Sequence, residues 1–313
     1  MGQQITMKKL LLFDASAVLH RAFHALPLLT NSKGVPTNAL HGFAKMVITL
    51  RETIAPHYMA ICFDTPVPSF RKKILTTYQA QRPKAPDEFK IQIPLAQEFC
   101  VKAKMPIFLK EGFEADDVIG TITKKAHEQL PDLHMYIFTG DKDILQLVTV
   151  DTTIIMPKIG VSTISYMDCD AVKGKMGIGP ELIVDFKALV GDSSDNYSGV
   201  KGIGPKKAQD LLAKYKSLAG IYNHLEELDL RTKELLLTNR ENAFVSQDLA
   251  RIRTDVDVNF TLQDTAVPES YLNQELSIFL DSYSLISVKK QMMKKNMALV
   301  VVDKQDTNQL SFF

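Results

Sequence analysis

Acidic residues recur in this sequence at positions where parallel strands would end. Asp14, Asp64 and Asp141 each follow a short apolar run within three residues. Because the carboxyl ends of parallel strands meet along one edge of a sheet, these three side chains are expected to converge there. Neighbouring carboxylates raise each other's pKa and destabilise a fold unless a cation neutralises them. The pattern therefore predicts a cation site at that edge.

Further acidic residues extend this set, and they share the carboxylate chemistry of the first three. The candidate metal ligands are Asp14, Asp64, Glu114, Asp116, Asp117, Asp141, Asp143, Asp192 and Asp195. An all-oxygen set favours Mg²⁺ or Mn²⁺ over Zn²⁺, because the Cys residues are scattered and no pair of His residues has ligand spacing. Each acidic segment alone also fits a helix N-terminus or a turn. Their expected convergence on one edge favours the metal site.

The elements that would position these acids alternate between strands and helices along the first two-thirds of the chain. Short apolar runs fit strands at 8–13, 58–63, 107–109 and 134–138, and helical spacing fills 39–54, 93–103 and 114–130. This alternation predicts an α/β fold with a mostly parallel sheet and helices on both faces. After about residue 168 the strand signal fades, and two Gly-Ile-Gly-Pro segments each open a helical pattern. A small helical subdomain is expected there.

Two basic segments accompany the acidic ones. Residues 65–98 have a net charge of +3 with aromatic residues between the charges, which suits phosphate contact and base stacking but also an ordinary surface loop. Residues 199–216 have a net charge of +4 and turn through glycines into a helix expected to start at Pro205. This composition fits a hairpin that grips a phosphate backbone without reading sequence. A nucleotide-binding loop fits less well, because no strand precedes these glycines and no Gly-Lys-Ser/Thr occurs.

The overall composition is that of a globular protein without a membrane segment. The chain has 313 residues, 45% of them apolar, and its apolar runs are far shorter than the ~20 residues of a membrane helix. No signal peptide is expected, and three scattered Cys residues favour a reducing compartment. The 37 Lys and Arg nearly balance 36 Asp and Glu, but without the nine candidate ligands only 27 acids remain. The small net charge therefore does not exclude a nucleic-acid partner.

Assembled in order, these motifs resemble the 5′-nuclease domain of bacterial DNA polymerase I, in the flap-endonuclease superfamily. The segments that carry the resemblance are 12–14, 21–23, 63–64, 70–71, 114–117, 139–147, 191–196 and 199–204. The resemblance implies a PIN-like core over 7–170 with a helical arch at 65–98. It also implies a helix–three-turn–helix element at 185–216, within a helical region at 171–288. The Lys-, Met- and Asn-rich composition of 289–313 predicts a flexible tail. A stand-alone nuclease is expected, since no polymerase domain follows the match.

The resemblance also implies roles for individual residues. It places all nine carboxylates on ligand positions for two Mg²⁺ or Mn²⁺ ions, and a K⁺ ion at the helix–three-turn–helix element. The implied catalytic set is Arg21, Arg82, Asp141 and Asp143, with both arginines on phosphate. The implied DNA contacts are Arg71, Lys72, Lys73, Tyr78, Gln79, Lys84, Lys201, Gly202, Gly204, Lys206 and Lys207.

One residue of the arch departs from the family pattern. The family motif reads Tyr-Lys-x-x-Arg, and Gln79 stands here in place of the lysine. An amide offers no charge to a developing phosphorane, so slower cleavage than in lysine-bearing relatives is expected. Lys72, Lys73 or Lys84 would compensate in part.

The function implied by the resemblance is that of a Mg²⁺-dependent 5′–3′ exonuclease and flap endonuclease in replication and repair. It would act as a monomer in the cytoplasm, at the nucleoid, on branched DNA with a single-stranded 5′ end and without a membrane partner. The alternatives are a catalytically weakened DNA-binding scaffold and a PIN-type ribonuclease. An aspartate phosphatase fits less well, because Ala15 and Ser16 follow Asp14 where that class needs Asp-x-Asp.

The last residues of the chain form a separate short motif. Gln309, Leu310, Phe312 and Phe313 are similar to peptides that dock on the bacterial sliding clamp. A terminal peptide on a linker would raise the local concentration of the nuclease at a clamp. A chance apolar terminus is the alternative.

Overall fold

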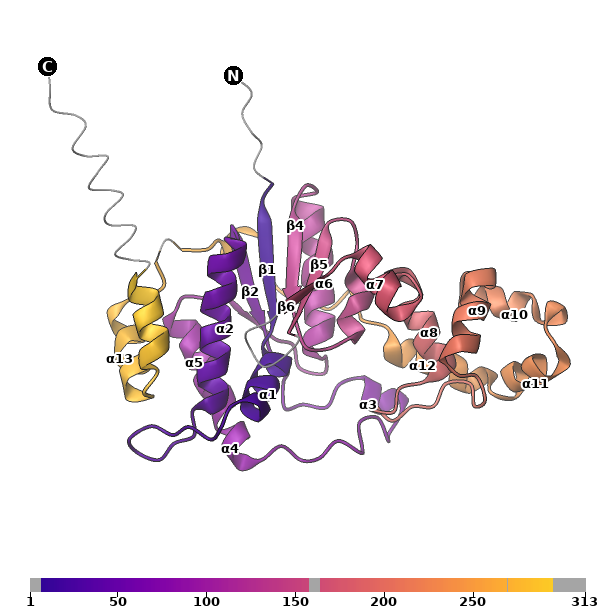
Figure 1. Ribbon diagram of the computed structural model, residues 1–313, viewed down its shortest axis with the longest axis horizontal. Coiled ribbons are helices and arrows are strands. Elements are labelled where there is room, and N and C mark those ends of the chain that lie inside the picture. Colours follow the sequence, from indigo (N-terminus) through magenta and orange to yellow (C-terminus); the bar gives the residue numbers. More distant parts are fainter. Residues whose placement is uncertain (1–6, 158–163, 269, 295–313) are drawn as a thin grey trace, which may run out of the picture.

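A central sheet organises the molecule. The computed structural model describes residues 7–157, 164–268 and 270–294, and within them six strands lie in the order β3-β2-β1-β4-β5-β6 (Figure 1). The strands are β1 (Lys9–Asp14), β2 (Tyr58–Cys62), β3 (Ile107–Phe108), β4 (His134–Phe138), β5 (Thr152–Pro157) and β6 (Ile164–Met167). The first five are mutually parallel and β6 is antiparallel to β5. The predicted mostly parallel sheet is confirmed, although β5 and β6 have no counterpart among the predicted strands.

The register of the sheet brings strand ends together. Phe13 of β1 lies level with Ile61 of β2 and with Phe138 of β4. These three strands therefore reach their carboxyl ends at one edge, which is the edge that the strand-end aspartates follow.

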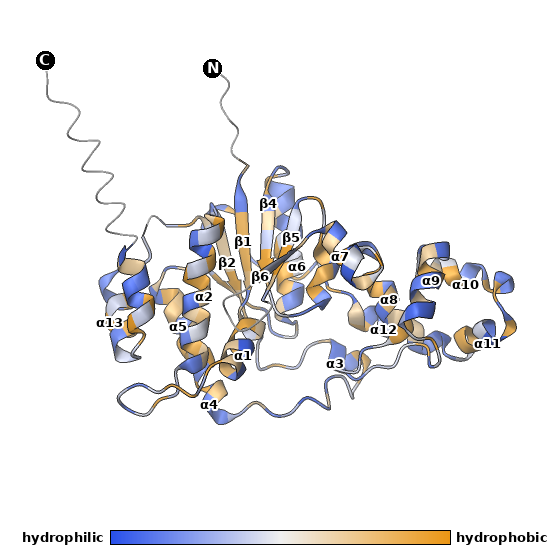
Figure 2. Cartoon of the chain, in the orientation of Figure 1, coloured by the Kyte–Doolittle hydropathy of each residue, from blue (hydrophilic) through white to orange (hydrophobic). Residues whose placement is uncertain are grey.

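Helices cover both faces of the sheet, as predicted. One face packs on α1 (Ala15–Ala25), α2 (Asn38–Ile54), α5 (Gln92–Lys102) and α13 (Gln274–Ser282). The other face packs on α6 (Ala115–Gln129), and this core continues into the helices that follow β6. Figure 2 shows the strands largely in the hydrophobic colour between these layers. The short apolar runs form strands because both of their faces are buried.

The chain beyond β6 is mainly helical, and over residues 169–250 it extends to one side of the sheet, whereas α13 returns to the other side (Figure 1). Its elements are α7 (Cys169–Met176), η2 (Pro180–Leu182), α8 (Ile183–Val190), α9 (Pro205–Tyr215), α10 (Leu218–Asn223), η3 (Leu225–Glu227), α11 (Leu230–Thr238), α12 (Arg240–Ala250) and η4 (Gln263–Thr265). The two Gly-Ile-Gly-Pro segments open η2 and α9, because proline at the first helical position has its φ already set. The loop 191–204 joins α8 to α9 and gives the expected helix–turn–helix connection.

The expected helical arch is largely irregular. Residues 65–90, called the strap below, contain only α3 (Arg71–Ile74) and α4 (Asp87–Lys90), and in Figure 1 they run along the lower side of the molecule. Pro66, Pro68, Pro83 and Pro86 divide the segment, and each proline removes an N–H donor and disfavours helix at the residue before it. The last part of the predicted arch belongs instead to α5, which packs in the core.

The predicted start of the tail is also wrong. Residues 286–294 are helical, and Val288 and Met292 are buried in the core that holds α13. The Met- and Lys-rich composition after residue 289 reads as a solvated segment, but the apolar residues are spaced four apart and share one helix face. The clamp-like peptide, Gln309, Leu310, Phe312 and Phe313, lies outside the described residues.

Candidate active site

Asp14 and Asp141 meet through one threonine where β1 and β4 end. Asp14 is the last residue of β1 and also caps α1, because its Oδ1 accepts from the backbone N of Ala17 at 3.0 Å. Its Oδ2 accepts from the Thr139 hydroxyl at 2.7 Å, and Thr139 in turn accepts from the backbone N of Asp141 at 2.9 Å. The carboxylate of Asp14 is therefore fixed by neutral donors, and the backbone of Asp141 is fixed beside it.

Asp64 and Asp116 join them at the N-terminus of α6. The Oδ1 of Asp64 accepts from the backbone N of Ala115 at 2.7 Å, one of the N–H groups that a helix start leaves without an internal partner. Asp116 stands in the first turn of the same helix. We call Asp14, Asp64, Asp116 and Asp141 the sheet-edge group.

The sheet-edge group is electrostatically strained. Burial, followed by the charge of Asp64, raises the pKa of Asp14 to about 7. Burial, followed by the charges of Asp141, Asp14 and Asp143, raises the pKa of Asp116 well above its usual value. Oxygen ligands that repel one another in this way fit a hard divalent cation, which removes the repulsion when it binds.

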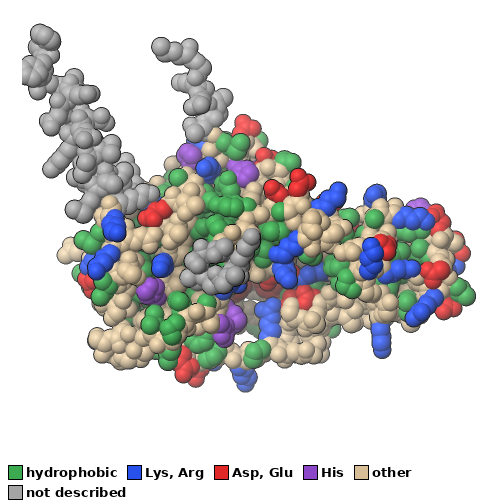
Figure 3. Space-filling view, viewed as in Figure 1, with side chains coloured by type: hydrophobic (Ala, Val, Ile, Leu, Met, Phe, Trp, Pro, Cys, Tyr) green, Lys and Arg blue, Asp and Glu red, His purple; other side chains and the backbone are tan. Residues whose placement is uncertain are grey.

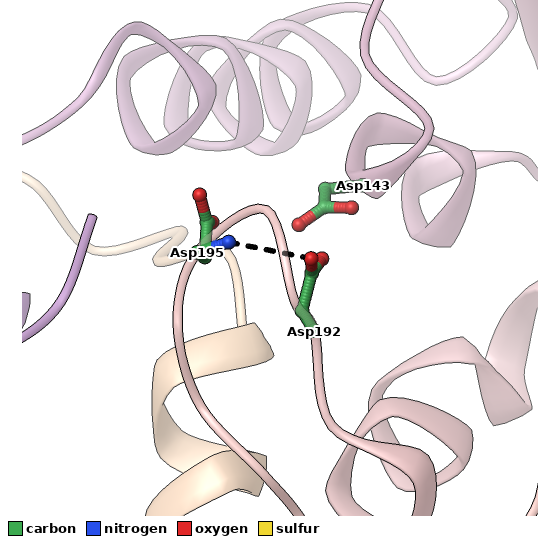
Figure 4. Close-up of side chains that lie close together, drawn as sticks. All are labelled: Asp143, Asp192 and Asp195. Atoms are coloured by element: carbon green, nitrogen blue, oxygen red, sulfur yellow. Dashed lines mark hydrogen bonds between the residues drawn. The ribbon is translucent and has the colours of Figure 1, made fainter. Parts of the chain in front are cut away.

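Three further carboxylates form a second cluster. Asp143 begins η1 (Asp143–Leu147), while Asp192 and Asp195 lie on the loop after α8, and one oxygen from each lies within 4.8 Å of the others. Figure 4 shows the carboxylates of Asp143 and Asp192 facing each other across the gap between these segments, with the backbone N of Asp195 turned toward Asp192. We call these residues the triad. The backbone N of Asp143 donates to Oδ1 of Asp141 at 2.9 Å, which links the two groups.

The loop that carries Asp192 and Asp195 is held by two glycines. Gly191 and Gly199 both have positive φ angles, 75° and 60°. A Cβ on Gly199 would lie 2.5 Å from the backbone N of Gly191, so only glycine permits this approach. The backbones of Asp192 and Tyr197 also exchange two hydrogen bonds, of 2.8 and 3.0 Å. Asp192 and Asp195 therefore lie on a turn that these glycines and hydrogen bonds hold in place.

Two protein-family models match this chain, one over the sheet and the other over the helical region that follows it. The model of the 5′–3′ exonuclease N-terminal, resolvase-like domain matches residues 9–177, and that of the 5′–3′ exonuclease C-terminal SAM fold matches residues 178–273. The chain belongs to the 5′–3′ exonuclease family. The predicted resemblance is thereby confirmed.

Curated relatives of this exonuclease agree with that family. A 5′–3′ exonuclease of Aquifex aeolicus is 37% identical over 268 residues, which cover 86% of this chain and 90% of the relative. DNA polymerase I of Caldicellulosiruptor bescii is 40% identical over 263 residues, 83% of this chain but 31% of the polymerase. The chain thus spans about a third of the polymerases that it matches.

Solved structures share the fold. The T5 D15 protein co-crystallized with metal ions has a TM-score of 0.67 at 18% identity, with 90% of this chain and 99% of that chain covered. The catalytic core of Rad2 in complex with DNA substrate has a TM-score of 0.54 at 14% identity, with coverages of 93% and 92%. Both confirm the predicted core and its helical extension.

Arg71 and Asp117 do not occupy the places expected of them. Arg71 was expected on DNA, but it is 2% exposed and its five N–H groups are all engaged. They reach Glu114, both oxygens of Asp117, and the carbonyls of Leu249 and Arg251. Asp117, expected on metal, is fully buried and accepts two further bonds, from the backbone N of Glu114 and of Arg253. With these bonds Asp117 is satisfied without a metal.

Glu114 lies between the strap and the sheet-edge group. Its oxygens accept from the Ser69 hydroxyl at 2.8 Å and from Arg71 at 3.1 Å. Burial raises the pKa of Glu114 to about 7, although the positive charge of Arg71 partly opposes this. The Glu114 side chain is 25% exposed, so a ligand could still reach its carboxylate. Within the segment 114–117 the same holds for Asp116, which is half-buried.

Tyr78 and Arg82 bind the strap to the triad. Tyr78 was expected to contact DNA, but it is 2% exposed and its hydroxyl donates to Oδ2 of Asp195 at 2.9 Å. Arg82 is half-exposed and its Nη2 lies 2.6 Å from Oδ1 of Asp195. Tyr78 is therefore not positioned to stack on a base in this structure, whereas the guanidinium of Arg82 lies at the acidic crevice.

Lys187 is a site residue that the sequence reasoning missed. Its Nζ forms ion pairs with Asp143 and, at 2.5 Å, with Asp192. Burial and the acidic neighbours raise the pKa of Asp143 to about 6, while Lys187 opposes that rise. Burial also acts to raise the pKa of Asp192, but the hydrogen bonds from Lys187 and Ser194 hold it below its usual value. In the sequence, Lys187 could have been linked to the site by its position one helical turn before Gly191, where the loop with Asp192 and Asp195 begins.

The basic hairpin presents its charges to solvent. Lys201, Lys206 and Lys207 are exposed around the turn into α9, and Gly204 caps that helix. Lys206 and Lys207 form surface ion pairs with Asp210 and Asp229, at 3.3 and 3.2 Å. Surface pairs of this kind are weak and are readily exchanged for phosphate.

The remaining expected contacts lie along α1 and the strap. Arg21 stands on α1, and Lys72, Lys73 and Lys84 are partly or fully exposed on the strap. Gln79 has a φ of 55° and its backbone N donates to the carbonyl of Asp195 at 3.0 Å. In Figure 3 a hollow opens between the strap and the core, and basic side chains gather beside it. Gly202, the last expected contact of the hairpin, is exposed with a φ of 96°.

The described helices do not include a candidate membrane span. None of them is both long enough and apolar enough to cross a bilayer.

Proposed function

We propose that this exonuclease is a metal-dependent, structure-specific 5′ nuclease that hydrolyses phosphodiesters near the single-stranded 5′ end of branched DNA. The observation that carries the proposal is the pairing of two carboxylate groups, joined by the bond from Asp143 to Asp141. Two adjoining oxygen-rich clusters suit two hard divalent ions and little else.

The sheet-edge group and the triad would hold the two ions, either Mg²⁺ or Mn²⁺. When bound, such ions supply a hydroxide from bound water and stabilise charge on the attacked phosphate and leaving oxygen. Thr139 keeps Asp14 and Asp141 oriented for this role, and the backbone of Asp143 keeps the two groups in register. Arg82 and Arg21 would bind the phosphate backbone, the first from the strap and the second from α1.

The duplex part of the substrate would lie on the helical region. The exposed Lys201, Lys206 and Lys207 next to the N-terminus of α9 support this, because N–H groups and lysines there bind phosphate without regard to base. A K⁺ ion between that turn and the duplex is part of the same proposal. The strap would admit a single-stranded 5′ end, so that specificity is for DNA structure rather than sequence.

Wider assignments complete the proposal. The nuclease core and the helical region would act together as a monomer in the cytoplasm, at the nucleoid, during replication and repair. The peptide at 309–313 would tether the chain to a sliding clamp.

The decisive experiment is cleavage of a 5′-labelled flap with Mg²⁺, with Mn²⁺ and with a chelator. We expect cleavage with either ion and none with the chelator. Single-stranded RNA of the same sequence serves as the comparison for a ribonuclease. Cleavage of the RNA in preference to the flap, or cleavage that survives the chelator, would overturn the proposal.

A further inference from the structure

The triad already has positively charged partners within the chain. Lys187 pairs with Asp143 and Asp192, and Arg82 pairs with Asp195 through Nη2 and Oδ1 at 2.6 Å. Three carboxylates thus face two cationic side chains. At the sheet-edge group, by contrast, Asp14 and Asp64 accept from a hydroxyl and backbone N–H groups, which are neutral donors.

These partners occupy the oxygens that a metal ion would use. One oxygen of Asp195 is held by Arg82 and the other accepts from Tyr78 at 2.9 Å, so a ligand to Asp195 must replace one of them. The ammonium of Lys187 is shared between the two carboxylates that face each other in Figure 4. A divalent ion placed beside either cation would be repelled at a few ångströms.

We infer that Lys187 and Arg82 are built-in counter-cations of the triad, which a divalent ion must displace in order to bind there. This inference rests on the proposed function, and it adds that the two metal sites differ in affinity. The sheet-edge group fills first, and the triad is a conditional site of lower affinity.

The strap links this displacement to the path of DNA. Besides Tyr78 and Arg82, the backbone N of Gln79 donates to the carbonyl of Asp195, and Asn196 donates to the carbonyl of Thr77 at 2.8 Å. Residues 77–82 are therefore docked on the triad loop. An ion that binds Asp195 displaces Arg82 and so weakens the contact between the strap and the triad loop. Conversely, DNA whose phosphate binds Arg82 frees Asp195 and strengthens binding of the ion. By linkage the two effects are equal in size.

The test measures Mn²⁺ binding to the whole protein without DNA, by the electron paramagnetic resonance signal of free Mn²⁺. Lys187→Met removes one positive charge at nearly constant volume, and Arg82→Gln removes one while it keeps a shorter polar side chain. We expect each to tighten the weaker Mn²⁺ constant at least about tenfold and leave the tighter one unchanged. Lys90→Gln, an exposed residue of the same strap, is the matched control and should leave both constants unchanged.

Hydrogen exchange supplies a second readout that does not depend on substitution of either cation. Saturating Mn²⁺ should speed amide exchange in residues 77–82 of the wild-type protein, and Asp195→Asn should abolish that response. Unchanged Mn²⁺ constants in both variants, or exchange at 77–82 that ignores Mn²⁺, would overturn the inference. If Mn²⁺ binds and flaps are cleaved while the constants do not move, the proposed function stands and only this inference fails. If no Mn²⁺ binds, both fail.

Discussion

Thr139 donates its hydroxyl hydrogen to Oδ2 of Asp14 over 2.7 Å, although 125 residues separate the two in sequence. The same oxygen of Thr139 accepts from the backbone N of Asp141. One hydroxyl therefore joins the carboxylate at the end of β1 to the backbone that follows β4 and carries Asp141. The geometry of the sheet-edge group depends on it.

Replacement of Thr139 by Val should test that dependence. The variant keeps the shape of the side chain but removes the hydrogen-bond partner of Oδ2 of Asp14 and of the N–H of Asp141, which should lower the free energy of unfolding by about 1–3 kcal/mol. Cleavage should fall as well, because Asp14 loses a bond that favours its charged form. Urea unfolding and a single-turnover assay measure the two effects. Thr149→Val, at an exposed position, is the control; equal stability of both variants would contradict the assignment.

Arg71 should stabilise the fold rather than contact DNA. Arg71→Met leaves Asp117 buried without its ion-pair partner, so we expect a loss of roughly 3–5 kcal/mol in the free energy of unfolding. Lys73→Met alters an exposed position of the same short helix and should cost less than about 0.5 kcal/mol. Chemical denaturation distinguishes them. An Arg71→Met protein as stable as the wild type would disprove the buried network.

Stability without metal should fall as pH rises. Asp14 and Asp143 have pKa values of about 7 and about 6, whereas in the unfolded chain an aspartate titrates near about 3.9. Between the unfolded and the folded pKa values, the folded protein binds more protons than the unfolded chain. The stability that protonation of Asp14 and Asp143 contributes is therefore complete below about pH 4 and is lost by about pH 7. Asp14→Asn should flatten the curve of Tm against pH relative to wild type. Mg²⁺ should flatten it too, because a bound ion favours the charged carboxylates; parallel curves would refute the shift.

Asp141 links the two carboxylate groups and should be needed for cleavage but not for DNA binding. Asp141→Ala should reduce the single-turnover rate by at least about a hundredfold, in line with loss of a group that supports metal catalysis. Affinity for a flap, measured by fluorescence anisotropy in Ca²⁺, should change less than about threefold, because most of it comes from backbone phosphate contacts. The exposed Asp132→Ala serves as control. Normal cleavage by Asp141→Ala would show that the metal assignment is wrong.

Gln79 should limit the rate of cleavage. Gln79→Lys places a charge where the family motif has one, and we expect the single-turnover rate to rise about tenfold because a charged donor binds phosphate more strongly than an amide. The backbone strain at φ 55° is common to both residues. Gln81→Lys adds the same charge two residues away and should have a smaller effect. Equal acceleration by both variants would indicate general attraction of DNA rather than a specific role.

The strand-end acids could be predicted because their signal is local. An apolar run followed by aspartate defines both the strand and its edge, and parallel pairing then brings Asp14, Asp64 and Asp141 together. The breaks in the strap were also readable, since prolines at 83 and 86 oppose a continuous arch. A resemblance to helical arches outweighed that local signal.

Other features depend on contacts between distant segments and had no local signal. Arg71 and Lys73 stand two residues apart in a basic run, yet the first is buried and the second exposed. The difference comes from Asp117 and from carbonyls about 180 residues later. Lys187 likewise lies in an apolar helix, and only the fold places its ammonium between Asp143 and Asp192.

The bonds of Arg71 also bear on how the chain is made. Two of its N–H groups end on carbonyls of Leu249 and Arg251, far beyond the first family-model match, which stops at residue 177. During synthesis the guanidinium of Arg71 therefore lacks two of its hydrogen-bond partners until those residues have been made. A fragment that ends near 177 would keep a charged pair with unmet donors in its interior. The two matched halves are thus joined by buried hydrogen bonds, and we expect a fragment that ends near 177 to be less stable than the whole chain.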